Sequence, residues 1–550
     1  MNPPRRQQPL PTPARGRRLL RRSFPLVVAL CVLFGFDLAH ANGRFPLAQQ
    51  LRALDSERLA LAGTYGLLVS AGDGGFRFVC EAELFGQAAP MDLVDPLLEI
   101  LPDGTLFTGS THALRVSKDG GCSFRTATTL PVNPAFFDTP PAGAPLRGRI
   151  MDITPLPTAE GVRLLVLATI EDEAGAVLEH RLYRSNADGS AFDAFGSAIP
   201  LSLTPLLLTV DVAPSDPDRI YVSGGFASAP VLLVSPDGGA TWNARPVSLQ
   251  DADSTSGLYI AAVDPGDANR VYLRVSRWTN SDSGALVWDD SLLVTRDGGD
   301  GFEEILRKQG NLLGFALTGD GKAVFAGYGD PQIAAIDTSP EALGIYAASS
   351  EDLNFEQRVP DLSVSCLRWI EGALYACARE RDPLGNDPTR ANDFHLGVYR
   401  GGTLPSARSD FTTLLKLKDV RGPLLWADGR ANACEVEWKM PDPATPDSLS
   451  TCQTLNACES AGRGPTETPQ CGAANAGAAG SAGMPAAGGG AGMSGAGGSS
   501  GGMAQGGSSA SCGCRTAPRN GPEAALVVLL IAVAGLGRNR RRAASQTQPG

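Results

Sequence analysis

Aspartates recur along the middle of this sequence in one fixed setting, and such carboxylates could bind a metal ion or take part in acid–base chemistry. Around Asp119 and Asp237 the pattern is hydroxyl residue, any, Asp, any, Gly, any, hydroxyl residue, aromatic. The copy around Asp297 lacks only the second hydroxyl, and a shorter relative contains Asp73. An Asp carboxylate accepts backbone N–H groups in tight turns, and Gly permits positive φ where the chain reverses. We therefore interpret these four aspartates as structural turn residues and not as catalysts or calcium ligands.

Other residue types give little sign of catalysis. Beyond residue 41 the histidines are His112, His180 and His395, and this scatter gives poor support to a metal centre or a Ser-His-Asp triad. No glycine loop between a strand and a helix indicates a phosphate site. Acidic residues are abundant enough to place two carboxylates about 5 to 9 Å apart, as glycosidases need, but the sequence selects no pair. We expect no metal and no cofactor.

Cysteines indicate an oxidising compartment. Cys366 and Cys377 lie at equal distances from Glu371-Gly372, so a tight hairpin there would bring the two sulfurs together. Four further cysteines lie in a Pro-rich segment and allow three connectivities, namely Cys434, Cys452, Cys458 and Cys471. We interpret residues 426–471 as a small appendage stapled by disulfides. A zinc site is the alternative, but the close Cys-x-x-Cys pairs that zinc prefers are missing.

The two ends of the chain are predicted to be targeting segments. Residues 1–41 combine a basic start, an apolar run and small residues ending at Ala41, which indicates a signal peptide cleaved after that residue. Arg21-Arg22 leaves both Sec and twin-arginine export open. Residues 472–511 are almost wholly Gly, Ala, Ser and Met, a composition of flexible, disordered stalks. Residues 512–550 follow as a tail with a predicted short hydrophobic helix over 524–537, which is shorter than the roughly 20 residues that span a bilayer comfortably.

This tail closely resembles the MYXO-CTERM sorting domain of myxobacteria. The resemblance rests on the Gly-rich linker, Cys512-Gly-Cys514, the short apolar run and a basic cluster made of Arg538, Arg540, Arg541 and Arg542. It implies a dedicated sorting protease as a partner, with Cys512 or Cys514 as the processed residue and the arginines as a retention signal. The protein would then be exported and held at the cell surface or outer membrane, or released, and only the tail would meet the membrane. The alternative is an ordinary membrane anchor with two nearby cysteines.

The elements that position the aspartates are predicted to be strands. A β-rich run that ends in small residues precedes each Asp turn, for example residues 103–109, 218–224 and 320–327. We expect the small residues to crowd around a central axis. The two signatures together give seven units between about residues 44 and 425. Each unit is predicted to form four short strands, as a propeller blade does. The prediction for residues 42–425 is an all-β, seven-bladed β-propeller, with six or eight blades as alternatives, in which the strand over 44–51 completes the last blade.

The combination resembles the sialidase-type, or BNR, Asp-box propellers, a superfamily that includes sortilin-like receptors, xyloglucanases and photosystem assembly factors. The runs 212–222 and 263–273 are especially similar to the assembly factors. Sialidases carry an Arg-Ile-Pro motif, an arginine triad, a Tyr nucleophile with its Glu, and an Asp acid. This sequence has no Arg-Ile-Pro, and Arg149-Ile150-Met151 lies too far along. The resemblance therefore implies the fold but does not imply a function.

Two hypotheses for function follow. The first is a nonenzymatic binding or scaffold module for a protein, peptide or glycan, with loops at one face formed by residues 278–291 and 379–394. The second is a secreted glycoside hydrolase acting on polysaccharide. Converging arginines with paired carboxylates at the axis would favour the enzyme. The net charge is −11, and the basic clusters lie at the two ends, so the middle is more acidic still and nucleic acid is not expected as a partner.

Overall fold

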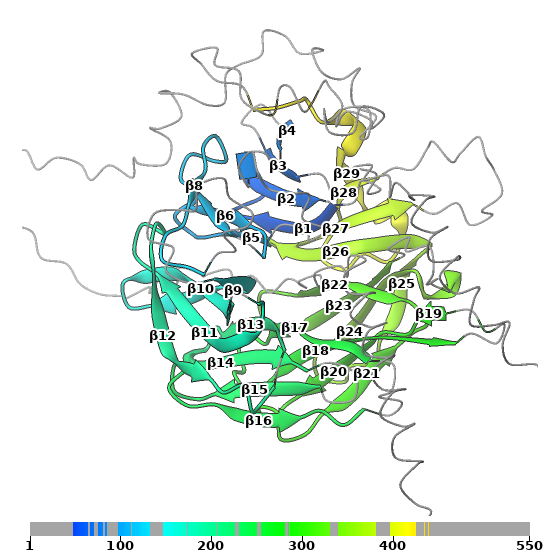
Figure 1. The fold of residues 1–550 in the computed structure, drawn as a ribbon. Coiled ribbons are helices and arrows are strands. Elements are labelled where there is room, and N and C mark those ends of the chain that lie inside the picture. The colour runs from blue at the N-terminus through cyan, green and yellow to red at the C-terminus, as the bar shows by residue number, and fades with distance from the viewer. Residues whose placement is uncertain are drawn as a thin grey trace, which may run out of the picture.

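The chain folds as a seven-bladed β-propeller, as the sequence predicts. The computed structural model describes residues 48–63, 66–70, 75–80, 83–84, 97–111, 113–131, 147–172, 174–204, 206–225, 230–249, 255–280, 284, 286–329, 339–380, 396–424, 434 and 438. These residues form seven sheets arranged around a common centre (Figure 1). None of the described helices is long and apolar enough to cross a membrane.

Each blade consists of strands that are consecutive in the chain. Blade 1 holds β1 (Ala48–Ala53), β2 (Leu59–Gly63), β3 (Gly66–Ser70) and β4 (Phe76–Val79), and blade 2 holds β5 (Leu97–Ile100), β6 (Leu106–Gly109), β7 (Leu114–Ser117) and β8 (Arg125–Thr126). Blade 3 holds β9 (Gly148–Thr158), β10 (Gly161–Glu171), β11 (Val177–Ser185) and β12 (Phe192–Ile199), and blade 4 holds β13 (Leu207–Ala213), β14 (Asp216–Gly224), β15 (Val231–Ser235) and β16 (Asn243–Pro246).

The remaining three blades repeat this order. Blade 5 holds β17 (Thr255–Val263), β18 (Val271–Asn280), β20 (Ser291–Thr295) and β21 (Glu303–Arg307), with β19 (Leu286–Trp288) paired to β18. Blade 6 holds β22 (Asn311–Leu317), β23 (Ala323–Gly329), β24 (Gly344–Ser349) and β25 (Glu356–Pro360), and blade 7 holds β26 (Leu362–Ile370), β27 (Ala373–Glu380), β28 (Leu396–Arg400) and β29 (Thr412–Lys416). Short 3₁₀ turns occur at Pro340–Ala342, Arg408–Asp410 and Leu417–Asp419.

The strand order gives the ring two distinct ends. The first strands of neighbouring blades pack against one another, so they are the innermost strands. Because consecutive strands are antiparallel, the second-to-third connections and the links between blades all lie at one end, which we call the loop face. The first-to-second and third-to-fourth turns lie at the other end, which we call the box face because Asp119, Asp237 and Asp297 lie there.

The hydrophobic core lies between the blades. Seven clusters of buried apolar side chains occur among the described residues, and each is shared by two adjacent blades. Leu61 of blade 1 and Tyr375 of blade 7 belong to one cluster, for instance, and Phe107 of blade 2 and Tyr183 of blade 3 to another. Since burial of apolar area is the main stabilising term, each blade depends on both of its neighbours.

The Asp turns also join one blade to the next. Ser197 on the outer strand β12 donates its backbone N–H to the carbonyl of Gly239, in the Asp turn of blade 4, over 2.8 Å. Gly196 has a φ of +67°, and a Cβ there would lie 2.4 Å from the same carbonyl oxygen, so only glycine fits this approach. Arg245 on β16 pairs with Asp300, in the Asp turn of blade 5, over 2.9 Å. An outer strand therefore docks on the Asp turn of the following blade.

Two details of the predicted arrangement are wrong. The runs that end in small residues are the second strands, such as β6, β14 and β23, and not the axial ones. Their glycines meet a neighbouring backbone at the loop face: a Cβ on Gly224 would lie 2.3 Å from the carbonyl oxygen of Leu206. Strand β1, which overlaps the predicted strand over 44–51, is the innermost strand of blade 1 and does not complete blade 7.

Candidate functional site

Asp237 is held by bonds from its own turn. Thr241 donates its backbone N–H to Oδ1 over 2.8 Å and its hydroxyl to Oδ2 over 2.7 Å, while the Ser235 hydroxyl reaches Oδ1 over 2.9 Å. The Thr241 bonds hold the pKa of Asp237 below its ordinary value. Gly239 donates its N–H to the Ser235 hydroxyl over 2.8 Å. The carboxylate therefore closes the turn between β15 and β16.

The other predicted aspartates repeat this geometry where the structure describes them. Asp119 accepts the backbone N–H of Ser123 over 2.9 Å and its hydroxyl over 2.6 Å. Asp297 accepts the N–H of Gly301 over 2.9 Å, and the missing second hydroxyl removes one bond relative to the other copies. Asp73 lies outside the described residues. No group of three or more His, Cys, Asp or Glu that could hold a metal occurs in the described part of the chain.

Asp188, in the corresponding turn of blade 3, predicts an acid dependence of stability. Hydrogen bonds from Ser190 lower the pKa of Asp188 to about 2, below its unfolded value of about 3.9. The stabilisation from this carboxylate is therefore present above about pH 4 and is lost as the pH falls towards 2. We expect Asp188→Asn to flatten the fall in unfolding free energy between pH 4 and 2. We expect Ser190→Ala to make that fall smaller, because it raises the folded pKa of Asp188 towards the unfolded value. Both are measured by urea unfolding. An unchanged acid limb in both variants would contradict this assignment.

The disulfides agree with one prediction and overturn another. The predicted pair Cys366–Cys377 is present, with its Cα atoms 4.8 Å apart across β26 and β27. Cys434 does not pair within residues 426–471 as expected, because it bonds to Cys80, which follows β4 of blade 1. Cys434 and Trp438 are buried in the core cluster between blades 7 and 1. Cys122 is also disulfide-bonded.

The predicted targeting residues lie outside the described part of the chain. These are the cleavage residue Ala41, the cysteines Cys452, Cys458, Cys471, Cys512 and Cys514, the apolar run 524–537, and the cluster Arg538, Arg540, Arg541 and Arg542. His112 and His395 lie outside it as well. The one predicted histidine that is described, His180, is buried on β11 and shares a 3.0 Å hydrogen bond between its Nδ1 and the Thr169 hydroxyl.

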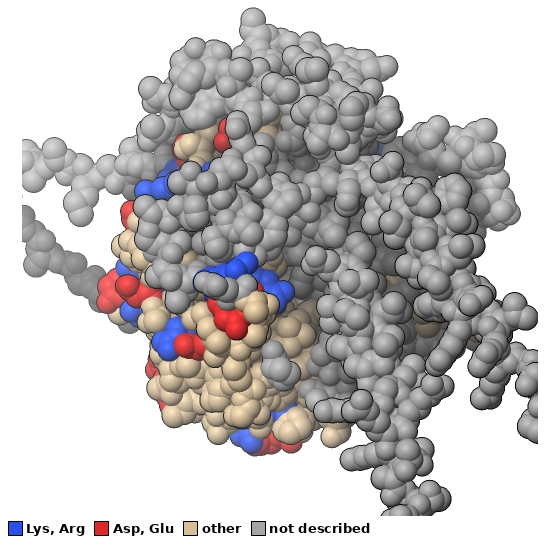
Figure 2. All heavy atoms as spheres, viewed as in Figure 1, with Lys and Arg blue, Asp and Glu red and all other residues tan. Residues whose placement is uncertain are grey.

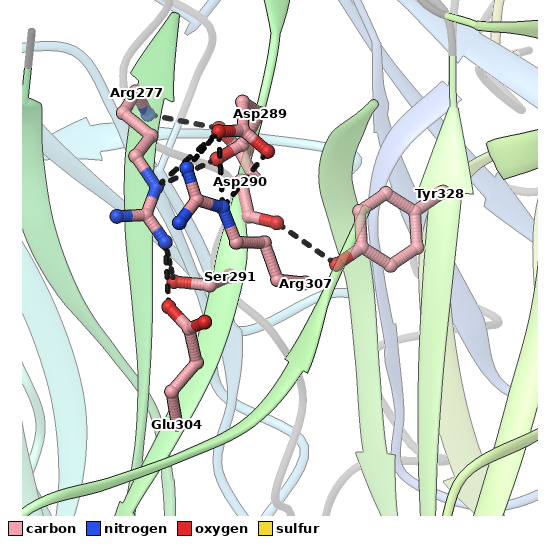
Figure 3. A network of polar contacts seen from close by, with 7 residues as sticks. All are labelled: Arg277, Asp289, Asp290, Ser291, Glu304, Arg307 and Tyr328. Carbon is pink, nitrogen blue, oxygen red and sulfur yellow. Dashed lines mark hydrogen bonds and ion pairs between the residues drawn. The ribbon is translucent and has the colours of Figure 1, made fainter. Parts of the chain in front are cut away.

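The two predicted insertions join second to third strands, so both begin and end at the loop face. Residues 381–395 lie outside the described chain. The insertion 278–291 is not a simple loop, because β18 continues to Asn280 and turns back as β19, with Trp278 opposite Trp288. After β19 the chain passes through Asp289 and Asp290 into β20. The carboxylates of these two residues belong to a cluster of charged side chains at the loop face (Figure 3).

Asp289 lies between two arginines in this cluster. Arg307, at the end of β21, donates its Nε to the Asp289 carboxylate over 3.0 Å, and the Arg277 Nε lies 4.0 Å from the same group. Arg277 also donates to the Ser291 hydroxyl over 2.8 Å and to Glu304 over 2.6 Å (Figure 3). The exposed side-chain fraction is 2% for Arg277, 6% for Asp289 and 41% for Glu304, so the cluster runs from the interior to the surface.

Asp290 lies deeper and joins blade 5 to blade 6. Its carboxylate accepts the Nε of Arg274 over 3.1 Å and the backbone N–H groups of Arg277 and Leu312 over 3.0 Å each. Arg274 reaches Asn311, the first residue of β22, over 2.8 Å. The Tyr328 hydroxyl donates to the carbonyl of Asp290 over 3.0 Å. Buried charges are tolerated when they are paired and hydrogen-bonded in this way.

Burial is the largest influence on the pKa values of Asp290 and Tyr328 in this cluster. It raises the pKa of Asp290, while Arg274 and the two backbone N–H groups oppose the rise. Burial also raises the pKa of Tyr328 well above its ordinary value, so its hydroxyl stays protonated and donates at neutral pH. The pairing of Arg274 with Asp290 and of Arg307 with Asp289 leaves the interior of the cluster close to electrical balance.

Buried carboxylates elsewhere in the described ring are also paired with arginines or backbone N–H groups. Six described carboxylates are buried, and each has a partner: Glu99 with Arg52, Asp152 with the N–H of Val210, Glu171 with Arg149, Asp264 with Arg270 and the N–H of Gly266, Asp289 with Arg307, and Asp290 with Arg274. A general acid or base must be able to exchange a proton with a substrate. The partners of these six carboxylates lie in the same turn, in a neighbouring strand or in the adjacent blade.

The sequence contained a signal for the charged cluster. Arg274 and Arg277 interrupt the mainly apolar run 271–278, and Asp289-Asp290 directly follows Trp288 and precedes the mainly apolar run 291–295. Charges inside buried strands require partners, so two arginines on one strand and two acids at the start of the next predict an internal ion-pair cluster. At the surface, acidic and basic side chains lie side by side in the described part of the view in Figure 2.

No protein-family model matches the chain, and no curated protein matches it. Solved structures with a similar arrangement include a protein of unknown function from Dyadobacter fermentans DSM 18053, which is 14% identical with a TM-score of 0.36. That match covers 56% of this chain and 95% of the other. A GH74 enzyme from Niastella koreensis is 14% identical with a TM-score of 0.35, and 66% of this chain covers 58% of its length.

The NanB sialidase from Streptococcus pneumoniae is a further neighbour. It is 12% identical with a TM-score of 0.32, and 68% of this chain covers 70% of the sialidase. At these identities and TM-scores the neighbours assign no role to any residue here.

Proposed function

We propose that this protein is a nonenzymatic recognition module whose loop face binds a protein, peptide or glycan. One observation carries the proposal: the buried carboxylates of the described ring are all engaged by arginines or backbone N–H groups. Arginines and acids do converge in blade 5, but they neutralise one another. A rigid ring with long connections at one end suits binding, because binding residues concentrate on loops that a rigid scaffold positions. The resemblance to sortilin-like and assembly factor-like propellers agrees with this role.

Binding is tested first against catalysis. The exported chain, which begins after the predicted cleavage at Ala41, is applied to a glycan array and a peptide array. In parallel it is applied to a panel of fluorogenic glycosides. We expect capture on an array without release of the fluorophore. Turnover that Glu304→Gln abolishes would establish a glycoside hydrolase instead, since Glu304 is the half-exposed carboxylate of the charged cluster.

The location of the binding surface is tested with a matched pair of surface leucines. Leu178, at the start of β11, lies at the loop face, and Leu404, in the turn after β28, lies at the box face. Both are 59% exposed. We expect Leu178→Asp to weaken capture of the ligand found on the arrays and Leu404→Asp to leave it unchanged. Equal effects of both substitutions would contradict a site at the loop face.

We also propose that the protein is exported and held at the cell surface by its tail. Disulfides in the propeller support an oxidising compartment. The test is fractionation of cells that express the full chain or a chain that ends at Ser511. We expect the shorter chain in the medium and the full chain on the cells, with Cys512→Ser and Cys514→Ser separating the role of each cysteine. Retention of the shorter chain would contradict the proposal.

A further inference from the structure

The ring has a seam between blade 7 and blade 1. Each of these sheets consists of four consecutive strands, so no described strand is exchanged between the last blade and the first. Across the seam β1 packs against β26, and one apolar cluster fills the space between the sheets. Blades 7 and 1 are not consecutive in the chain, so no connection between neighbouring strands joins them as it joins the other blade pairs.

The chain after blade 7 crosses this seam. Residues 421–424 run along β4, the outer strand of blade 1, with a parallel bridge between Phe78 and Pro423. Phe78 donates its N–H to Gly422 over 2.7 Å and accepts the N–H of Leu424 over 3.2 Å. The Arg77 guanidinium donates to the carbonyl of Arg421 over 2.7 Å. The segment therefore acts as an additional short strand that covers the edge of blade 1.

Cys80, which directly follows β4, is bonded to Cys434, further along the chain from Leu424. Cys80 is fully buried and Cys434 is 1% exposed, and the Cys80 N–H lies 3.0 Å from the Cys434 sulfur. Trp438 is 1% exposed and packs against Phe78 with the ring centroids 5.4 Å apart. The chain that leads to the C-terminus is thus attached to blade 1, although it leaves the propeller from blade 7. The bond encloses a sequence separation of 354 residues.

We propose that Cys80–Cys434 is a mechanical clamp that keeps the ring closed when the C-terminal tail is under tension. Without the Cys122 bond, force that reaches Trp438 along the chain meets Cys434 before it meets residues 421–424. The covalent bond passes this force to Cys80, so the hydrogen bonds along β4 and the seam are bypassed. Blades 2 to 7 lie inside the closed loop and cannot be extended between the chain ends. The use of the clamp on cells rests on the proposed surface tether, but the clamp itself does not.

The test stretches the exported chain between handles at its two ends, in optical tweezers. All proteins carry Cys122→Ser, because Cys122 is disulfide-bonded as well and its bond would also limit extension. We compare this reference with Cys80→Ser/Cys434→Ser and, as the matched control, Cys366→Ser/Cys377→Ser. At about 3.3 to 3.6 Å per residue, loss of the clamp should lengthen the fully unfolded chain by about 120 nm. The control disulfide lies inside the closed loop, so its loss should leave the length unchanged.

Force decides between a clamp and a passive crosslink. We expect the Cys80/Cys434 variant to show a first opening event at lower force than the reference, because the seam now carries the load. The proposal is overturned if that variant first opens at the same force as the reference, or if the reference already extends fully. Should the variant not fold, the oxidised Cys366→Ser/Cys377→Ser control, which keeps Cys80–Cys434, is stretched before and after reduction on one molecule. Array binding and cell fractionation do not enter this readout, so their failure is distinguishable from failure of the clamp.

Discussion

Replacing Asp290 by alanine should lower the free energy of unfolding by about 3 to 5 kcal/mol. The Arg274 side chain is 3% exposed and would be left as a buried charge without its counter-ion. The backbone N–H groups of Arg277 and Leu312 would lose their acceptor at the same time. Because Leu312 belongs to blade 6, we expect the loss to weaken the contact between two blades. The measurement is urea unfolding of the exported chain at neutral pH.

Two controls separate the ion pair from a general effect of substitution. Asp290→Asn keeps the volume and one acceptor oxygen but turns an amide towards the donors, so we expect a smaller loss than for alanine. Asp300→Ala removes a carboxylate that is 62% exposed and pairs with Arg245 on the surface. Surface pairs contribute about 0 to 1 kcal/mol. If Asp290→Ala costs no more than Asp300→Ala, the cluster does not stabilise the ring.

Removing the Cys80–Cys434 disulfide should destabilise the protein more than removing Cys366–Cys377. A crosslink restricts the unfolded chain, and the restriction grows with the length of the enclosed loop. The two sequence separations are 354 and 11 residues. The chain-entropy relation then gives losses of about 6 and about 3 kcal/mol respectively. Double Cys→Ser variants in the Cys122→Ser background, unfolded in guanidinium chloride, measure both.

The difference between the two losses of unfolding free energy separates loop closure from local packing. Both disulfides lie in the same apolar cluster, so the loss of buried sulfur is similar in the two variants. Equal losses would show that local packing and not loop closure determines the contribution of each bond.

The parts of the fold that depend on neighbouring residues were predictable from the sequence. The turn at Asp237 needs only residues 235–242, and the hairpin that pairs Cys366 with Cys377 turns at Glu371-Gly372. These signals lie within a few residues of one another, so they appear as repeated patterns. The number of blades follows from counting the repeats.

The parts that depend on distant segments were not predictable in the same way. Cys434 lies among three other cysteines in the sequence, and nothing local indicates Cys80 as its partner. The placement of β1 depends on the same closure of the ring. The charged cluster of blade 5 had a local signal in Arg274 and Arg277, but the partners become evident only when β18 and β20 pair. Long-range closure and buried charge pairing are thus set by the tertiary structure.

Because a late segment of the chain completes blade 1, this blade stays incomplete for part of the time in which the protein is synthesised. Residues 421–424 complete the edge of a blade whose own strands are among the first to leave the ribosome. At about 5 to 20 residues per second, some 354 residues take roughly 20 to 70 s to synthesise. During that time the outer edge of β4 has no strand beside it, and bare strand edges invite pairing with other chains. A chaperone that shields this early edge until the last-made segment arrives would raise the yield of the native protein.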